Sequence, residues 1–166
     1  MKEKKEKLRQ LIEQAKQRDQ EVEELVQHTF DILKESRQAI DKFIQETVMP
    51  VLEEIKGEIE ADFKHVSIEQ IDSSATMTMA SGAKLPGESK YTKEKRYSVE
   101  VNGATRKAKG KLKLLNVVPG SGSQKDFVIA EEDITGHDKD ENIDNIAAEH
   151  IWDNFLAVYD KSLNNK

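Results

Sequence analysis

The sequence has no cysteine, only three prolines and only nine aromatic residues among its 166 residues. Without cysteine, disulfide bonds, thiolate nucleophiles and cysteine-ligated zinc or iron–sulfur sites are excluded. No apolar run reaches the length of a membrane span, and no apolar segment follows the charged first seven residues. We therefore expect a cytoplasmic protein without a membrane span.

Glycine and proline are both missing from the first 49 residues. Nothing in this stretch interrupts a helix, and ~40 helical residues extend ~60 Å at ~1.5 Å per residue. That length is about twice the diameter of a domain built from the remaining residues. Pro50 lacks a backbone donor and clashes with the preceding turn, so we expect the helix to end or kink near Met49.

Apolar residues in this helix recur at heptad positions a, d and e, which is typical of a coiled coil or a helix with a broad contact face. The stripe suits packing against two neighbouring helices or one broad surface. It is interrupted by Arg18 and Asp19 at d and e. The pattern predicts that the protein forms a homo-oligomer or binds a helical partner, through Leu8, Leu11, Val22, Leu25, Ile32 and Phe43.

Beyond Pro50 the sequence predicts an α+β domain. Helical spacing continues to Phe63, and apolar residues then alternate with polar ones, as in strands. A closing helix over residues 141–164 is expected to pack on the sheet. The fold class is therefore a long N-terminal helix, an antiparallel sheet of three or four strands and a C-terminal helix. We divide the chain into an extended amphipathic helix, 1–49, and a head domain, 50–166.

Asn102-Gly103 is the strongest short-range hairpin signal in the chain. A two-residue loop there would place Val101 opposite Ala104 and Glu94 opposite Lys111. Because side chains alternate between faces, one face of the hairpin is apolar and the other is basic. The basic outer face carries Arg96, Lys107, Lys109, Lys111 and Lys113.

This basic face stands out in an acidic chain of net charge −6, since residues 90–113 carry nine bases against two acids. The lysines either bind an anionic partner, such as nucleic acid or an acidic helix, or only keep the sheet surface soluble. No aromatic residue is interleaved with the lysines to stack on bases. The choice between binding and solubility stays open from the sequence.

No motif predicts an enzyme, a cofactor or a metal site. The acidic segment from Asp138 to Glu149 spaces its oxygen ligands as a calcium loop does, but Ile143 occupies the position that requires glycine. Asp138 instead fits an N-cap of the closing helix. His28, His65, His137 and His150 are scattered, and no P-loop or nucleophile elbow is present.

Two stretches, Val99–Ala104 and Asp138–Ala148, together with the order of long helix, antiparallel strands and closing helix, resemble the YbaB-type bacterial nucleoid-associated proteins. The resemblance covers only the back half and implies DNA binding by a dimer. Our first hypothesis is a non-enzymatic assembly module that self-associates through its N-terminal helix. The alternative is a nucleic-acid-binding dimer that uses the basic outer face.

Overall fold

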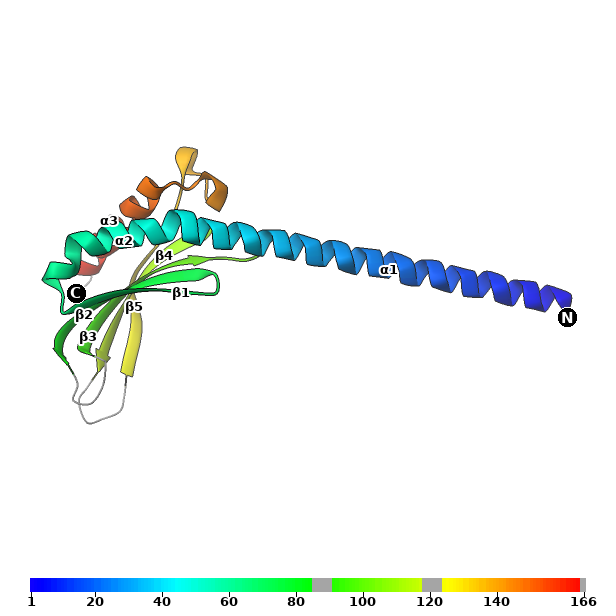
Figure 1. The fold of residues 1–166 in the computed structure, drawn as a ribbon, viewed down its shortest axis with the longest axis horizontal. Helices are drawn as coiled ribbons and strands as arrows, with labels where there is room; N and C mark the ends of the chain where they lie inside the picture. Colours follow the sequence, from blue (N-terminus) through cyan, green and yellow to red (C-terminus); the bar gives the residue numbers. More distant parts are fainter. Residues whose placement is uncertain (85–90, 118–123, 165–166) are drawn as a thin grey trace. The chain divides into compact units, whose positions relative to one another are not determined.

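The structure is a computed structural model that describes residues 1–84, 91–117 and 124–164. It divides into two compact units, Met1–Gln38 and Ala39–Lys166, which we call the arm and the sheet domain. The boundary lies inside α1 (Lys2–Phe43), labelled in Figure 1. It lies before residue 49 because Ile40, Phe43, Ile44 and Val48 all belong to the buried core of the sheet domain.

The helix does not end at Pro50. A π-helical turn, η1 (Ile44–Val48), leads directly into α2 (Met49–Ile59), in which Pro50 occupies the first turn. Proline fits this position although it has no N–H to donate, because the π-helical turn interrupts the regular i→i−4 hydrogen bonding just before it. Where the sequence predicted an end or a kink, the structure has one π-helical turn. A short 3₁₀ turn, η2 (Glu60–Asp62), then connects α2 to the sheet.

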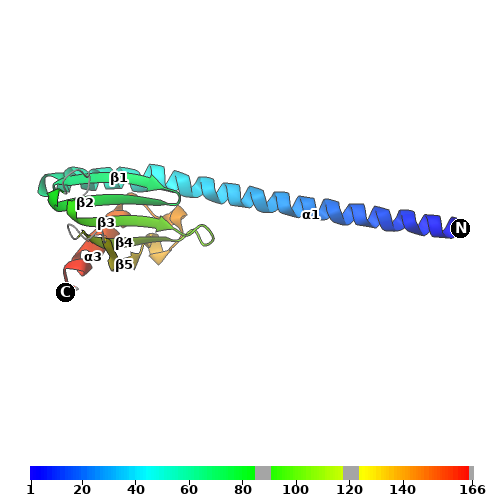
Figure 2. The ribbon, with the colours of Figure 1, turned by 90° about the horizontal axis from the view of Figure 1, so that it is seen from below.

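The sheet has five antiparallel strands, in the order of the chain, rather than three or four. They are β1 (His65–Ile71), β2 (Ser74–Lys84), β3 (Tyr91–Val101), β4 (Ala108–Val117) and β5 (Gln124–Asp133), shown side by side in Figure 2. The count was too low because the two-residue turn Asp72-Ser73 separates β1 from β2. Asp72 makes that turn with a φ of 51°.

The predicted hairpin loop was wrong in length. Val101 pairs with Ala108 instead of Ala104, and Glu94 pairs with Leu115 instead of Lys111. The Asn102 side chain accepts hydrogen bonds from the N–H groups of Ala104 and Thr105, at 2.9 and 3.1 Å, and so stabilises a longer loop. The pairing shifts by four residues. Because four is even, each residue of the β3–β4 ladder keeps its predicted face, whereas Lys107 lies outside β4 and bridges to Asn142.

The inner face of the sheet is buried under α2 and α3 (Ala148–Asn164), which lie on the same side in Figure 1. One row of paired residues crosses all five strands and packs into this core: Ile68, Met77, Tyr97, Leu112 and Ala130.

The closing helix begins at Ala148, so Asp138 is not its N-cap. Residues 137–147 instead contain two short 3₁₀ turns, η3 (His137–Lys139) and η4 (Ile143–Asn145). Asn142 favours the second turn because its side chain accepts a 2.9 Å hydrogen bond from the N–H of Asp144. Ile143 and Ile146, which would have lain on the helix, are buried in the core.

Candidate interaction surfaces

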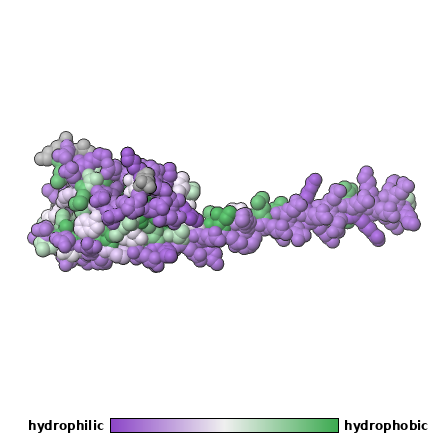
Figure 3. All heavy atoms as spheres, turned by 90° about the horizontal axis from the view of Figure 1, so that it is seen from above, coloured by the Kyte–Doolittle hydropathy of each residue, from purple (hydrophilic) through white to green (hydrophobic). Residues whose placement is uncertain are grey.

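The apolar stripe of the arm is exposed. Every residue from Met1 to Glu35 is exposed, including the large side chains of Leu8 (57% exposed) and Leu25 (66% exposed). Figure 3 shows this as separate hydrophobic patches, in green, along a largely hydrophilic helix. Large apolar side chains that recur along one side of a helix and stay in water are typical of a contact face.

The stripe is wider in its second half than the predicted a, d and e positions. Phe30, at heptad position b, is 62% exposed and lies one turn from both Val26 and Leu33 on the helix surface. Aromatic residues contribute strongly to contact surfaces. The heptad assignment missed Phe30 because it favours a narrow seam, although its spacing from Val26 was readable in the sequence.

Phe43 differs from the other five residues predicted for self-association. It is only 6% exposed and packs in the core of the sheet domain. The exposed surface therefore consists of the stripe before residue 36, with Leu8, Leu11, Val22, Leu25 and Ile32 as its predicted members.

The basic residues of the outer face lie among carboxylates. Lys107 is 2.8 Å from Glu141, Lys109 is 3.2 Å from Glu131 and Lys111 is 2.8 Å from Glu100. Arg96 is paired with Glu94 on its own strand, at 3.0 Å. Among the described residues, Lys113 has no ion pair. The sequence could not show Glu131 and Glu141 as partners because they come from β5 and from the segment before α3, whose positions depend on the fold.

Two of these ion pairs favour the charged form of their lysine. The hydrogen bond that Lys111 donates to Glu100 raises the pKa of Lys111 above its ordinary value of 10.5. The hydrogen bond from Lys107 to Glu141 raises the pKa of Lys107 in the same way. Because the carboxylates lie on the same surface, the local excess of positive charge is smaller than the sequence suggests.

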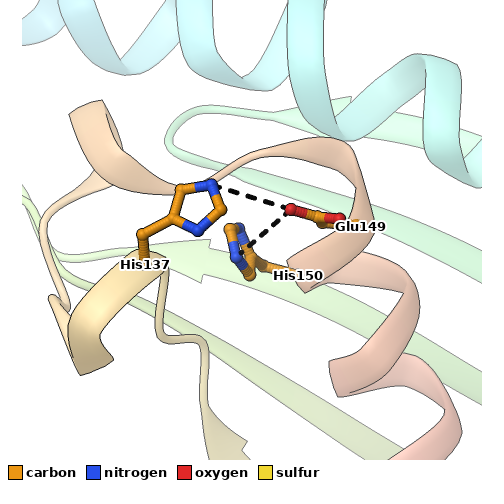
Figure 4. Close-up of side chains that lie close together, drawn as sticks. All are labelled: His137, Glu149 and His150. Carbon is orange, nitrogen blue, oxygen red and sulfur yellow. Dashed lines mark ion pairs between the residues drawn. The ribbon is translucent and has the colours of Figure 1, made fainter.

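Folding also brings together His137, Glu149 and His150, whose nearest ligand atoms all lie within 4.8 Å (Figure 4). Both histidine Nε2 atoms are 3.7 Å from the same oxygen of Glu149. Their imidazole rings meet edge to face at 4.8 Å between centroids. Their positions in the sequence did not predict this cluster, because η3 and the first turn of α3 meet only in the folded domain.

The hydrogen bonding of His150 argues against a metal centre. Its Nδ1 accepts a 2.8 Å hydrogen bond from the N–H of Ala147, so in the neutral ring the proton is on Nε2. Nε2 then faces Glu149 as a donor and has no lone pair for a metal. Metal-binding histidines show the opposite arrangement, since their second nitrogen donates. His150 instead caps the start of α3, as Glu or Gln does in a capping box.

A buried polar group holds α3 against the sheet. The Tyr97 hydroxyl donates a 2.6 Å hydrogen bond to the side-chain oxygen of Asn154, whose amide donates a 3.1 Å bond to the carbonyl of Glu132. Tyr97 also meets Phe155 edge to face at 5.0 Å. Burial raises the pKa of Tyr97 well above its ordinary value of 10.0. These contacts are structural, as expected for an aromatic cluster in a small core.

Comparison with protein-family models, curated proteins and solved structures found no match for this chain. Among the described residues, no helix has the length and apolar character needed to cross a membrane.

Proposed function

We propose that this chain is a non-enzymatic assembly module of the cytoplasm, which self-associates through the apolar stripe of the arm. The sheet domain is then a folded unit attached to this assembly helix. The observation that carries the proposal is the stripe, in which large apolar side chains recur at heptad spacing and stay exposed from Leu8 to Leu33.

Physical chemistry supports this choice. Burying one leucine or isoleucine contributes about 1.5–3 kcal/mol, so a few layers of stripe residues supply enough free energy for stable association. A helix exposed on all sides has no tertiary packing of its own, and such packing provides most helical stability in proteins. A second helix on the stripe would provide it.

The test is the mass of the protein in solution, measured by light scattering. The intact chain is expected to be an oligomer, and the double variant Leu25→Asp and Ile32→Asp is expected to be a monomer. Gln20→Asp with Gln27→Asp is the matched control, because it adds the same charge at heptad position f, away from the stripe. An intact chain that stays monomeric at high concentration contradicts the proposal.

The runner-up is nucleic-acid binding through Arg96, Lys107, Lys109, Lys111 and Lys113. It is supported by the alternate positions of Arg96, Lys109, Lys111 and Lys113 on β3 and β4, with Lys107 next to the start of β4. It is weakened by the carboxylate partners of four of the five side chains. Binding of this kind falls steeply with salt. The runner-up is supported if the chain binds DNA at low salt and loses this binding when Lys107, Lys109 and Lys111 are replaced by glutamine. The absence of DNA binding at low salt contradicts it.

A further inference from the structure

The arm is divided into two halves of opposite charge. Residues 1–18 carry seven bases and three acids, a net charge of +4. Residues 19–38 carry two bases and six acids, a net charge of −4. Both halves are helical, and the apolar stripe runs through both.

This division discriminates between the two ways in which a pair of arms can associate. In a parallel pair, each half lies against the like-charged half of the other copy. In an antiparallel pair, each basic half lies against an acidic half. We propose that the occupant of the stripe is a second copy of the arm in antiparallel orientation, an inference that rests on the self-association proposed above.

The heptad pattern selects a register for this pair. In an antiparallel pair, residues at heptad position a come level with residues at position d of the second copy. When the two arms overlap over their whole length, Lys2 is level with Gln38 of the second copy. Leu8 is then level with Ile32, Leu11 with Thr29 and Ala15 with Leu25. Each of these layers occurs twice because the pair has two-fold symmetry.

The same register accounts for the charged interruption of the stripe. Arg18 comes level with Val22 of the second copy, close to the two-fold axis, where its guanidinium is near Glu21 of that copy. At the g positions, which flank the same side of the seam, Lys7 lies within two residues of the level of Glu35 of the second copy, so their long side chains can meet. In a parallel pair, Arg18 would face Arg18 at a d layer, and such like-charge contacts are unfavourable. Arg18 therefore disfavours the parallel orientation and is compatible with the antiparallel one.

Because the chain contains no cysteine, introduced thiols report on orientation without competition. Leu11→Cys and Thr29→Cys are made as separate full-length proteins and oxidised alone and as a mixture. In the antiparallel pair, like thiols are ~27 Å apart, from 18 residues at ~1.5 Å, and only the mixture forms a disulfide. In a parallel pair, each variant alone forms the disulfide.

The outcomes separate the two proposals. A dimer in light scattering that cross-links only in the mixture supports the antiparallel pair. A dimer in which each variant cross-links with itself overturns the orientation and leaves self-association intact. A monomer overturns self-association itself. Ala15→Cys with Leu25→Cys checks a second layer, and a dimer in which neither mixed pair cross-links also overturns the register.

The salt dependence of association is an independent test of the orientation of the pair. Raising the salt concentration from about 50 mM to about 500 mM screens the charges, so it weakens an antiparallel pair and strengthens a parallel one. Lys7→Glu alone is expected to weaken association about two- to tenfold, and Lys7→Glu combined with Glu35→Lys is expected to restore it. Equal weakening by the single and the double variant would contradict the predicted contact.

Discussion

The arm and the sheet domain use aliphatic residues in opposite ways. In the sheet domain, Leu52, Ile55 and Leu112 are fully buried, whereas Leu8, Leu25 and Ile32 in the arm are at least half exposed. The domain therefore holds its own hydrophobic core, whereas every residue of the arm from Met1 to Glu35 is exposed. The exposure of these residues over so many turns is the observation that the proposed self-association explains.

The largest effect expected from a single substitution is in the domain. In Gly110→Ala, the added Cβ would collide with the Asn154 side chain between β4 and α3. Overpacking, together with loss of the hydrogen bond between Asn154 and Tyr97, is expected to lower the free energy of unfolding by about 3 kcal/mol or more. Denaturant unfolding followed by the fluorescence of Trp152 measures this change.

Gly57→Ala is the matched control, because nothing lies within 4 Å of the added Cβ in α2. It is expected to stabilise the domain by up to about 1 kcal/mol, since alanine favours a helix over glycine. The two units are separable if Gly110→Ala unfolds the domain and leaves association of the arm intact. If Gly110→Ala loses both the folded domain and the association of the arm, the two units do not fold and associate independently.

High pH should destabilise the domain through Tyr97. The raised pKa keeps Tyr97 neutral in the folded state, whereas in the unfolded chain it ionises near its ordinary value of 10.0. The stabilising contribution is therefore complete below pH 10 and is lost as the pH rises, with about 2 kcal/mol gone by about pH 11.5. Urea unfolding as a function of pH should show a shallower decline in Tyr97→Phe than in the intact chain. Equal slopes would contradict this assignment.

Dilution should affect only the arm. If the arm is stabilised by association, each tenfold dilution lowers the stability of the pair by about 1.4 kcal/mol, whereas the domain has no such dependence. Thermal unfolding followed by far-UV circular dichroism should show a concentration-dependent transition that is missing from the Trp152 signal. A helical signal that is independent of concentration would show that the arm needs no partner.

The smallest effect concerns the cap of α3. His150→Ala removes the acceptor for the N–H of Ala147 and is expected to cost about 0.5–1 kcal/mol. His150→Gln keeps an acceptor at the same position and should lose less. Equal losses in the two variants, measured by chemical unfolding, would assign the effect to packing rather than to capping.

The sequence predicted best where structure follows from local periodicity. The N-terminal helix and the two faces of the β3–β4 hairpin were readable from spacing alone. The loop was not, because the Asn102 side chain stabilises a longer turn than Asn-Gly alone suggests. The start of α3 also escaped prediction, since burial of Ile143 and Ile146 outweighs their helical spacing.

The candidate surfaces also divide into features that local periodicity predicts and features that depend on the fold. The exposed residues of the stripe were predictable because a helix needs only its own sequence to place them on one side. The ion pairs of Lys107 and Lys109 and the cluster of His137, Glu149 and His150 join segments that are separated along the chain. Such contacts depend on strand order and on turns that local patterns do not determine.

The order of the strands has a consequence for how fast the domain folds. Each strand pairs with its neighbour in the sequence, so the sheet can grow one strand at a time, with few residues between successive strands. Proteins with such local contacts fold faster than those with distant pairings. The contact between α2 and α3 joins segments from opposite ends of the domain. We expect the docking of α3, with Tyr97 and Asn154 at its centre, to complete the folding of the domain.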